Sequence, residues 1–391
     1  MTNMWNEAKV MVRALCLPAV LAILLAQLCN AFEWQIEMVD DTGAGQYSSL
    51  KIDTDGNAHV AYVVESTHGL KYGFWDHKLK RWFTMPVAGG ASFCSLTLDS
   101  KQRPHLSYAD FGTGKGAMLR YVYWDGASWK GQGIPIKTAD VIAYYTSIAL
   151  DRNDRPTISF YNYEGSGGGF VLTMRTASWN GSYWESRTVD GTYGSGKFNY
   201  IASDTAGRPH LVYANVGAMN ASLRYARWDG DRWRAEILEG ADHAYYVESV
   251  AIAIDSRDTP HITYTDVVNQ VVKYATRQGG KWSFQRVDTL LRRRYPDRNG
   301  IALDVEGNPF ISYFDAATGL LKVASKSNDK WLTEVVDQSF SGYTSSLQIA
   351  RGVLWVTYCD DSGGLKCARR NVSDSKRTDG KPGDLPFKDM R

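Results

Sequence analysis

Seven copies of one strand pattern predict an all-β fold, a seven-bladed β-propeller of four-stranded blades. Three observations support this prediction. Apolar runs that end in aspartate recur 46 to 53 residues apart, and short strand-like segments follow each run in the same order. Aromatic residues make up 13% of the chain, and no long helical pattern interrupts it, which favours β-structure.

The aspartates mark the end of the first strand in six of the seven copies. They close segments such as "SLTLD", "SIALD" and "AIAID", whereas the seventh copy, "SLQIA", ends at Ala350 without an acid. The six residues are Asp53, Asp99, Asp151, Asp204, Asp255 and Asp304.

The other three strands of each copy follow in a fixed order. A polar turn leads to a second strand of the "PHLSY" type, a third such as "LRYARW", a tight turn and a fourth such as "WLTEVVD". Proline opens the second strand in five copies, at a position that tolerates a missing amide donor.

The N-terminal strand is expected to complete the last blade. The seventh copy ends after "GLKCARR" without a fourth strand, and "WQIEMVD" (34–40) resembles the fourth-strand segment "WLTEVVD" (331–337). Such closure removes free sheet edges. We therefore expect the propeller to span 32–371, followed by a flexible polar tail at 372–391.

The first thirty-one residues are typical of a secretory signal peptide. Lys9 and Arg13 precede an apolar run at 14–28 that is too short and too interrupted by proline for a membrane span. Small residues ending at Ala31 suit signal peptidase, so a secreted or periplasmic chain starting at Phe32 is expected. A lipoprotein anchor at Cys29 is the alternative.

Export would leave three cysteines in the chain. Cys359 and Cys367 flank a predicted hairpin turn, which predicts a disulfide between them, with two reduced, packed thiols as the alternative. Cys94 is interpreted as a small buried hydrophobe, since no dedicated base accompanies it.

Charge and motifs narrow the classes of partner. A net charge of +2 is too small for a surface that follows phosphates, so nucleic acid is not expected. The segment "DTDGN" from Asp53 has the neutral Val64 where a calcium loop needs its last acid, and we predict no metal site and no cofactor. A divalent ion in the channel is possible but not indicated, and a monomer is expected.

Histidine and tyrosine recur at fixed places in the second strand. The histidine position also takes Thr157, Phe310 and Trp355, which favours packing over metal ligation. Phe160 replaces the tyrosine once, which indicates that the ring matters more than the hydroxyl. The two rows are His59, His105, His210 and His261, and Tyr62, Tyr108, Tyr213, Tyr264, Tyr313 and Tyr358.

Three turns between third and fourth strands share a motif. "YWDGASW", "SWNGSYW" and "RWDGDRW" place Asp125, Asn180 and Asp229 before a glycine and then a tryptophan. These turns resemble a loosened Asp-box of the sialidase-like, bacterial-neuraminidase-repeat propellers. The resemblance implies a folding role for the three residues, away from an active centre, and it does not extend to the catalytic residues of true sialidases.

One face of the propeller is expected to bind the ligand. The loops from strand four to the next strand one, and from strand two to strand three, emerge there around the channel. They carry aromatic rings and hydrogen-bond acceptors, which suit the apolar faces and hydroxyls of sugars. The predicted ligand-binding residues are Tyr47, Glu65, His68, Phe93, Asp110, Tyr145, Asn162, Asn215, Asp266, Asp315, Tyr343 and Asp360.

Two loops on this face are candidates for catalysis, at 240–249 and 289–300. A histidine or tyrosine base beside an arginine that neutralises a uronate would suit β-elimination, and a solvated basic loop is the alternative. The candidate catalytic residues are His243, Tyr245, Tyr246, Arg292, Arg293, Arg294 and Arg298.

Three functions follow from these predictions. The first is a secreted, lectin-like propeller that binds a glycan or polysaccharide, which the arginine-rich loop allows to be acidic. The second is a polysaccharide lyase or glycoside hydrolase acting on an acidic polysaccharide, and the third is a protein-interaction scaffold. The sequence does not decide whether the protein is an enzyme.

Overall fold

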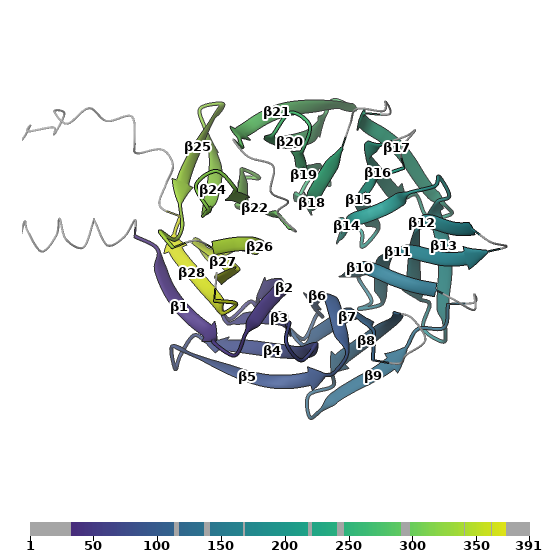
Figure 1. Cartoon of the computed structure of the whole chain (residues 1–391), viewed down its shortest axis with the longest axis horizontal. Helices are drawn as coiled ribbons and strands as arrows, with labels where there is room; N and C mark the ends of the chain where they lie inside the picture. The colour runs from purple at the N-terminus through teal and green to yellow at the C-terminus, as the bar shows by residue number, and fades with distance from the viewer. Residues whose placement is uncertain are drawn as a thin grey trace, which may run out of the picture.

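The computed structural model confirms the seven-bladed β-propeller. The described residues are 33–112, 117–136, 141–166, 169–217, 221–240, 246–290, 298–339, 341–360 and 362–372, and they form seven four-stranded antiparallel sheets. The first strand of each blade lines a central channel, and the fourth lies at the outer edge (Figure 1).

The blades are numbered along the chain. Blade 1 consists of β2 (Ala44–Ile52), β3 (Ala58–Val64), β4 (Gly69–Asp76) and β5 (Arg81–Ala88), and blade 2 consists of β6 (Ala91–Leu98), β7 (Pro104–Asp110), β8 (Met118–Trp124) and β9 (Trp129–Gly133). Blade 3 consists of β10 (Val141–Leu150), β11 (Pro156–Ser166), β12 (Gly169–Trp179) and β13 (Trp184–Asp190), and blade 4 consists of β14 (Ser195–Ser203), β15 (Pro209–Asn215), β16 (Ser222–Trp228) and β17 (Trp233–Gly240). Blade 5 consists of β18 (Val247–Ile254), β19 (Pro260–Asp266), β20 (Val271–Gln278) and β21 (Lys281–Thr289). Blade 6 consists of β22 (Gly300–Leu303), β23 (Pro309–Asp315), β24 (Leu320–Ser327) and β25 (Lys330–Val335). Blade 7 consists of β26 (Ser341–Ala350), β27 (Val353–Asp360), β28 (Leu365–Asn371) and β1 (Gln35–Asp40).

Blade 7 is closed by the N-terminal strand, as the sequence predicts. The strand order is β1-β28-β27-β26, and Gln35 pairs with Arg369 in the antiparallel register. The Arg369 guanidinium also forms an ion pair with Glu37 at 2.7 Å. The two ends of the described chain are thus held in one sheet.

The aspartate at the end of each first strand builds the turn that follows it. In blade 1, Oδ1 of Asp53 accepts hydrogen bonds from the amides of Asp55 (2.9 Å) and Asn57 (2.8 Å). The same two bonds recur at the other five aspartates of the row. The repeated acid therefore satisfies amides that a short turn would otherwise leave unpaired.

The repeated histidines are structural. In blade 2, Nδ1 of His105 lies 2.6 Å from the Tyr121 hydroxyl, and Nε2 lies 3.4 Å from Oδ2 of Asp99. A neutral imidazole fits this arrangement, because it accepts from the tyrosine and donates to the aspartate. The contact with the tyrosine hydroxyl recurs at His59, His210 and His261. Nε2 of each lies 3.3 to 3.5 Å from the aspartate of its own blade, and all three histidines are buried.

The tyrosine row uses its hydroxyls, contrary to our interpretation. In blades 1, 4, 5, 6 and 7 the hydroxyl donates to an acid near the end of the preceding fourth strand, as Tyr62 does to Asp40 at 2.7 Å. Before Phe160 that strand is β9, which ends in "WKGQG" and carries no acid. Phe160 therefore stands at a position where the preceding fourth strand offers no carboxylate to accept a hydrogen bond.

The predicted disulfide is not formed, and Cys359 and Cys367 are both free cysteines. In the strand register Cys367 lies opposite Thr357, and Cys359 lies opposite Leu365. The two cysteines are thus diagonal neighbours, which in antiparallel sheets lie about 7–8 Å apart and beyond the usual Cα separation of a disulfide.

Within the described part of the chain no helix is long and apolar enough to cross a membrane.

Candidate functional site

The two faces of the propeller differ in their connections. On the loop face lie the connections between fourth and first strands, such as 89–90, and between second and third strands, such as 65–68. On the turn face lie the connections between first and second strands, such as 53–57, and between third and fourth strands, such as 77–80. The sequence analysis predicts that the ligand binds on the loop face.

Four aromatic rings form a collar at the loop-face end of the channel. They come from the first strands of blades 1 to 4 and are Tyr47, Phe93, Tyr145 and Phe198. Neighbouring ring centroids lie 4.5, 4.6 and 5.0 Å apart. The structure thus brings together the predicted residues Tyr47, Phe93 and Tyr145 and adds Phe198, which is 9% exposed.

A repeated β-bulge turns these rings toward one another. In blade 2 the register shifts between Ser92 and Ser95, so that Phe93 and Cys94 stand opposite the single residue Tyr108. The same shift occurs at the other three rings, and all four collar residues have φ between 50° and 53°. A left-handed backbone costs about 1–2 kcal/mol for a residue with a side chain, so the fold holds the collar in place against this strain.

Hydrogen bonds between blades hold the collar backbone. The Cys94 thiol donates to the Tyr47 carbonyl at 3.1 Å, the Thr146 hydroxyl to the Phe93 carbonyl at 2.6 Å, and the Asn199 amide to the Tyr145 carbonyl at 2.7 Å. Each donor follows the collar residue of its own blade. Burial raises the pKa of the Cys94 thiol to about 12, which agrees with a structural role.

Two cations lie beside the collar. Nη1 of Arg298 donates to the Cys94 carbonyl of blade 2 at 3.3 Å, and its guanidinium carbon lies 5.8 Å from the Tyr200 ring centroid. Lys197 Nζ lies 4.7 Å from the Phe198 ring centroid and 3.4 Å from the Tyr246 hydroxyl. Among the described residues, no carboxylate forms an ion pair with either cation.

Other candidate catalytic residues lie outside the described part of the chain. They are His243, Tyr245, Arg292, Arg293 and Arg294. Tyr343 belongs to β26, and its side chain is also outside the described part. Of the candidate catalytic set the structure therefore describes Tyr246 and Arg298, both beside the collar.

Most of the expected hydrogen-bond acceptors lie inside the blades, which corrects our expectation of a polar rim. Asp110, Asn215, Asp266, Asp315 and Asp360 are each at most 8% exposed. Cations of the third strand and amides of the local turn occupy the carboxylate oxygens, as Lys322 does with Asp315 at 2.7 Å. The Asn215 amide donates to Ser195 Oγ at 2.8 Å and its carbonyl accepts from the Gly217 amide. These residues stabilise the ends of the blades.

The sequence contains a signal for this pairing that our predictions did not include. A lysine or arginine recurs near the start of the third strand, and in five blades it also contacts the acid of the preceding fourth strand. In blade 5, Lys273 lies 2.7 Å from Glu239 and 3.0 Å from Asp266. The recurrent cations are Lys71, Arg120, Arg224, Lys273, Lys322 and Lys366.

Three predicted rim residues have other environments. Glu65 and His68 are exposed in the loop after β3, and His68 has a left-handed φ of 50°. Asn162 is buried in β11, where its amide lies 3.4 Å from Glu164 and its carbonyl oxygen has no partner among the described residues. Glu65 and His68 thus remain accessible on the loop face.

The three Asp-box-like residues build turns on the turn face. Oδ1 of Asp125 accepts hydrogen bonds from the amides of Ala127 and Ser128, both at 2.8 Å. Asn180 and Asp229 accept from the amides at the same two positions of their own turns. The geometry agrees with the folding role implied by the resemblance.

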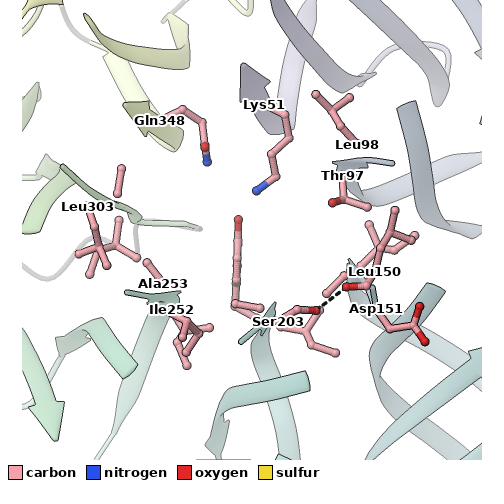
Figure 2. Close-up of a pocket in the computed structure, with 18 of the residues that line it drawn as sticks. Lys51, Thr97, Leu98, Leu150, Asp151, Ser203, Ile252, Ala253, Leu303 and Gln348 are labelled. Atoms are coloured by element: carbon pink, nitrogen blue, oxygen red, sulfur yellow. Dashed lines mark hydrogen bonds between the residues drawn. The ribbon is translucent and has the colours of Figure 1, made fainter. Parts of the chain in front are cut away.

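The turn-face half of the channel contains a cavity of about 440 Å³. Its wall consists of the last residues of the first strands, and Tyr200 lies at its inner end toward Arg298. Lys51 and Gln348 point into this space from adjacent blades (Figure 2). In the described residues, no group of three or more His, Cys, Asp or Glu side chains could hold a metal ion.

Comparisons with solved structures agree with the propeller fold. A PL25 ulvan lyase bound to -[GlcA(1-4)Rha3S]- superposes with a TM-score of 0.55 at 11% identity, over 87% of this chain and 98% of that one. Polysaccharide lyase Uly1 gives 0.53 at 10% identity, over 83% and 90% of the two chains. AofleA from Arthrobotrys oligospora gives 0.52 at 12% identity, over 78% and 89%.

No family model matches the chain, and no curated protein does. The similarity to solved structures, at 10–12% identity, establishes the fold alone.

Proposed function

We propose that the protein is a lectin-like propeller that binds a glycan at the loop-face end of its channel. The observation that carries this proposal is the collar of Tyr47, Phe93, Tyr145 and Phe198, held by a repeated bulge with a left-handed backbone. Backbone strain of this kind is concentrated at binding sites, and aromatic rings suit the apolar faces of sugars.

The two cations beside the collar favour an acidic glycan. Arg298 and Lys197 have no ion-pair partner among the described residues, and a uronate carboxylate would supply one. Two propellers of similar fold are polysaccharide lyases by name, one of them with a bound GlcA-containing ligand, which supports a carbohydrate ligand here. Such a ligand also suits a protein exported after cleavage near Ala31, as the sequence predicts.

A second candidate function is polysaccharide cleavage by β-elimination. It is favoured by the Tyr246 hydroxyl, which accepts a hydrogen bond from Lys197 Nζ at 3.4 Å, because a tyrosine beside a lysine is a suitable acid or base for such a reaction. In such a step a base removes the proton next to the uronate carboxylate and a carbon–carbon double bond forms. The bond to the leaving oxygen breaks, and an acid gives that oxygen a proton. Arg298 would stabilise the charge that develops on the carboxylate.

The test is to incubate the purified protein with neutral and uronate-containing polysaccharides and to follow binding, new reducing ends and the ultraviolet absorbance of unsaturated uronates. Binding without new ends supports the lectin-like function, and new ends with ultraviolet absorbance support elimination. Neither signal with any polysaccharide would overturn both and favour a protein partner.

Matched variants locate the binding. Phe93→Ala removes one ring of the collar and is expected to weaken binding about twofold to tenfold, since one aromatic contact contributes about 0.5–1.5 kcal/mol. Tyr183→Ala removes an exposed ring on the turn face and should leave binding unchanged. Equal binding by both variants would contradict a site at the collar.

A further inference from the structure

The turn-face cavity has one polar side and one apolar side. Each blade contributes the residue two positions before the repeated aspartate, or before Ala350 in blade 7, and the structure describes all seven of these residues. Blades 7, 1 and 2 supply Gln348, Lys51 and Thr97, whereas blades 3 to 6 supply Ala149, Ala202, Ala253 and Ala302. The polar members of this row therefore lie on three neighbouring blades and face an alanine wall on the other four, where Tyr200 and Ser203 of blade 4 also line the cavity.

Lys51 is the cation of this cavity. It is half-buried in β2, and its ammonium group points toward the centre of the channel (Figure 2). Among the described residues it has neither an ion pair nor a side-chain hydrogen bond. A lysine held in this way offers an unneutralised charge to a cavity of about 440 Å³, a volume in the range of small-molecule sites.

The two acids at the edge of the cavity, Asp151 and Asp154, accept hydrogen bonds from turn residues. Asp154 accepts hydrogen bonds from the amide and the hydroxyl of Ser100, at 2.8 and 2.6 Å. Oδ1 of Asp151 accepts from the amides of Asn153 and Arg155. Both acids belong to blade 3, two blades away from Lys51, and neither forms an ion pair with it in the described structure.

The mouth of the cavity is held by hydrogen bonds between successive turns. The Thr54 amide donates to Gln102, Ser100 donates to Asp154, and the Thr205 amide donates to Asp258 at 2.7 Å. Nη1 of Arg351 donates to the carbonyl of Asp55 across the junction of blades 7 and 1. These bonds hold the strand ends that carry Lys51, Gln348 and Thr97, so the backbone at these three residues is in place before a ligand binds.

We propose that this cavity is a second binding site, for a small organic carboxylate. The Lys51 ammonium supplies the counter-charge, and the Gln348 amide and Thr97 hydroxyl donate hydrogen bonds to the same oxygens. The alanine wall leaves room for the apolar part of the ligand. Tyr200 lines this cavity, and its ring centroid lies 5.8 Å from the guanidinium carbon of Arg298 beside the collar, so the tests below must distinguish this site from the glycan site proposed above.

The test is titration of the purified protein with acetate, D-glucuronate and citrate by calorimetry, with D-glucose as the uncharged match to glucuronate. The alanine methyl signals of the cavity wall report the location in methyl NMR spectra. We expect at least one carboxylate to bind and to shift the methyl signals of Ala202 and Ala253, and glucose to bind at least about tenfold more weakly than glucuronate.

Variants separate the cavity from surface charge. Lys51→Gln is expected to weaken carboxylate binding at least about tenfold, and Gln348→Ala to weaken it by a smaller factor. Lys101→Gln removes the same charge from an exposed position of the neighbouring turn, and it should bind like the original protein. Unchanged thermal unfolding of the variants would show that the fold is intact.

Three results would overturn the proposal. They are the absence of binding by all three carboxylates, equal affinity of Lys51→Gln and Lys101→Gln, and binding that leaves the cavity methyl signals unshifted. If the Lys51→Gln variant still binds a glycan at the collar, the two proposed sites can be tested independently of each other.

Discussion

The hydroxyl of Tyr62 in β3 donates a hydrogen bond to Oδ2 of Asp40 in β1 at 2.7 Å, and so ties blade 1 to the blade that closes the ring. Lys71 reaches the same oxygen at 2.7 Å. Burial alone would raise the pKa of Asp40, but the hydrogen bonds from Lys71, Thr42 and Tyr62 lower it to about 2. The carboxylate is thus charged and paired at neutral pH.

Removing this hydroxyl should destabilise the ring. Tyr62→Phe leaves a buried, charged acceptor without its tyrosine donor, and we expect a loss of about 1–3 kcal/mol in the free energy of unfolding by urea. Tyr108→Phe is the matched control, since no carboxylate accepts from the Tyr108 hydroxyl among the described residues. A similar loss in both variants would mean that the ring environment, and not the clamp to Asp40, causes the effect.

The buried histidines should make the protein less stable in mild acid. Burial lowers the pKa of His105, His210 and His261 below the ordinary value of about 6.5. Below that value the unfolded chain binds more protons than the folded one, so the stability present above it is lost as the pH falls. Urea midpoints at about pH 8 and about pH 5.5 measure the loss, which should shrink in His105→Gln.

A pH-independent midpoint over this range would contradict neutral, buried histidines in these three blades. Midpoints that fell equally in His105→Gln and in the original protein would assign the acid sensitivity to other groups.

The turn at Asp154 allows strain and hydrogen bonding to be separated. Asp154 has a φ of 58°, at the turn position where Gly56 and Gly207 stand in blades 1 and 4. Asp154→Ala removes the bonds to Ser100 and keeps a left-handed residue, so a loss of about 1–3 kcal/mol in stability is expected. Asp154→Gly removes the same bonds but accepts this backbone readily, and its loss should be smaller.

Thermal and urea unfolding of the two variants measure the difference. If the alanine variant were as stable as the glycine variant, the left-handed conformation would carry no cost at this turn.

The three described cysteines should be unreactive thiols in the folded protein. Burial raises the pKa of Cys94 and of Cys359 to about 12, and it raises the pKa of the Cys367 thiol as well. A thiol reagent at about pH 8 should therefore label none of them in the native state and all three after unfolding in denaturant. Labelling is counted by mass spectrometry without a reducing agent. If the protein were two mass units lighter and only Cys94 were labelled after unfolding, Cys359 and Cys367 would form a disulfide after all.

The blades and the closure of the ring could be predicted because the sequence of each blade repeats the same strand pattern. The recurring aspartates fix the end of each first strand, and "WQIEMVD" matches a missing fourth strand. The collar could be predicted in part, because Tyr47, Phe93 and Tyr145 stand at the same point of successive copies. The bulge that turns these rings inward leaves no mark in the hydrophobic pattern, since it adds one residue to one strand in each of these blades.

Pairing between side chains was harder to predict. Asp266 and Asp315 stand at strand ends, where polar residues usually face solvent, and the lysines that neutralise them come from the next strand in the sheet. Lys51 was missed for a different reason. In "SLKID" it takes a position where four other copies have alanine. A single charged residue near the end of a strand is ordinary, and only the closure of the ring shows that this one lines a cavity.

The sheet shared by the two ends of the chain sets the order in which the molecule can be completed. Glu37 and Arg369 meet across 332 positions of sequence, whereas six blades are built from strands that follow one another directly. During synthesis those six can assemble as their segments emerge, while β1 must wait for β28. Until then the ring has two unpaired strand edges, and they invite pairing with a second chain in the same unfinished state. Ring closure is therefore the step at which this protein is most exposed to domain swapping.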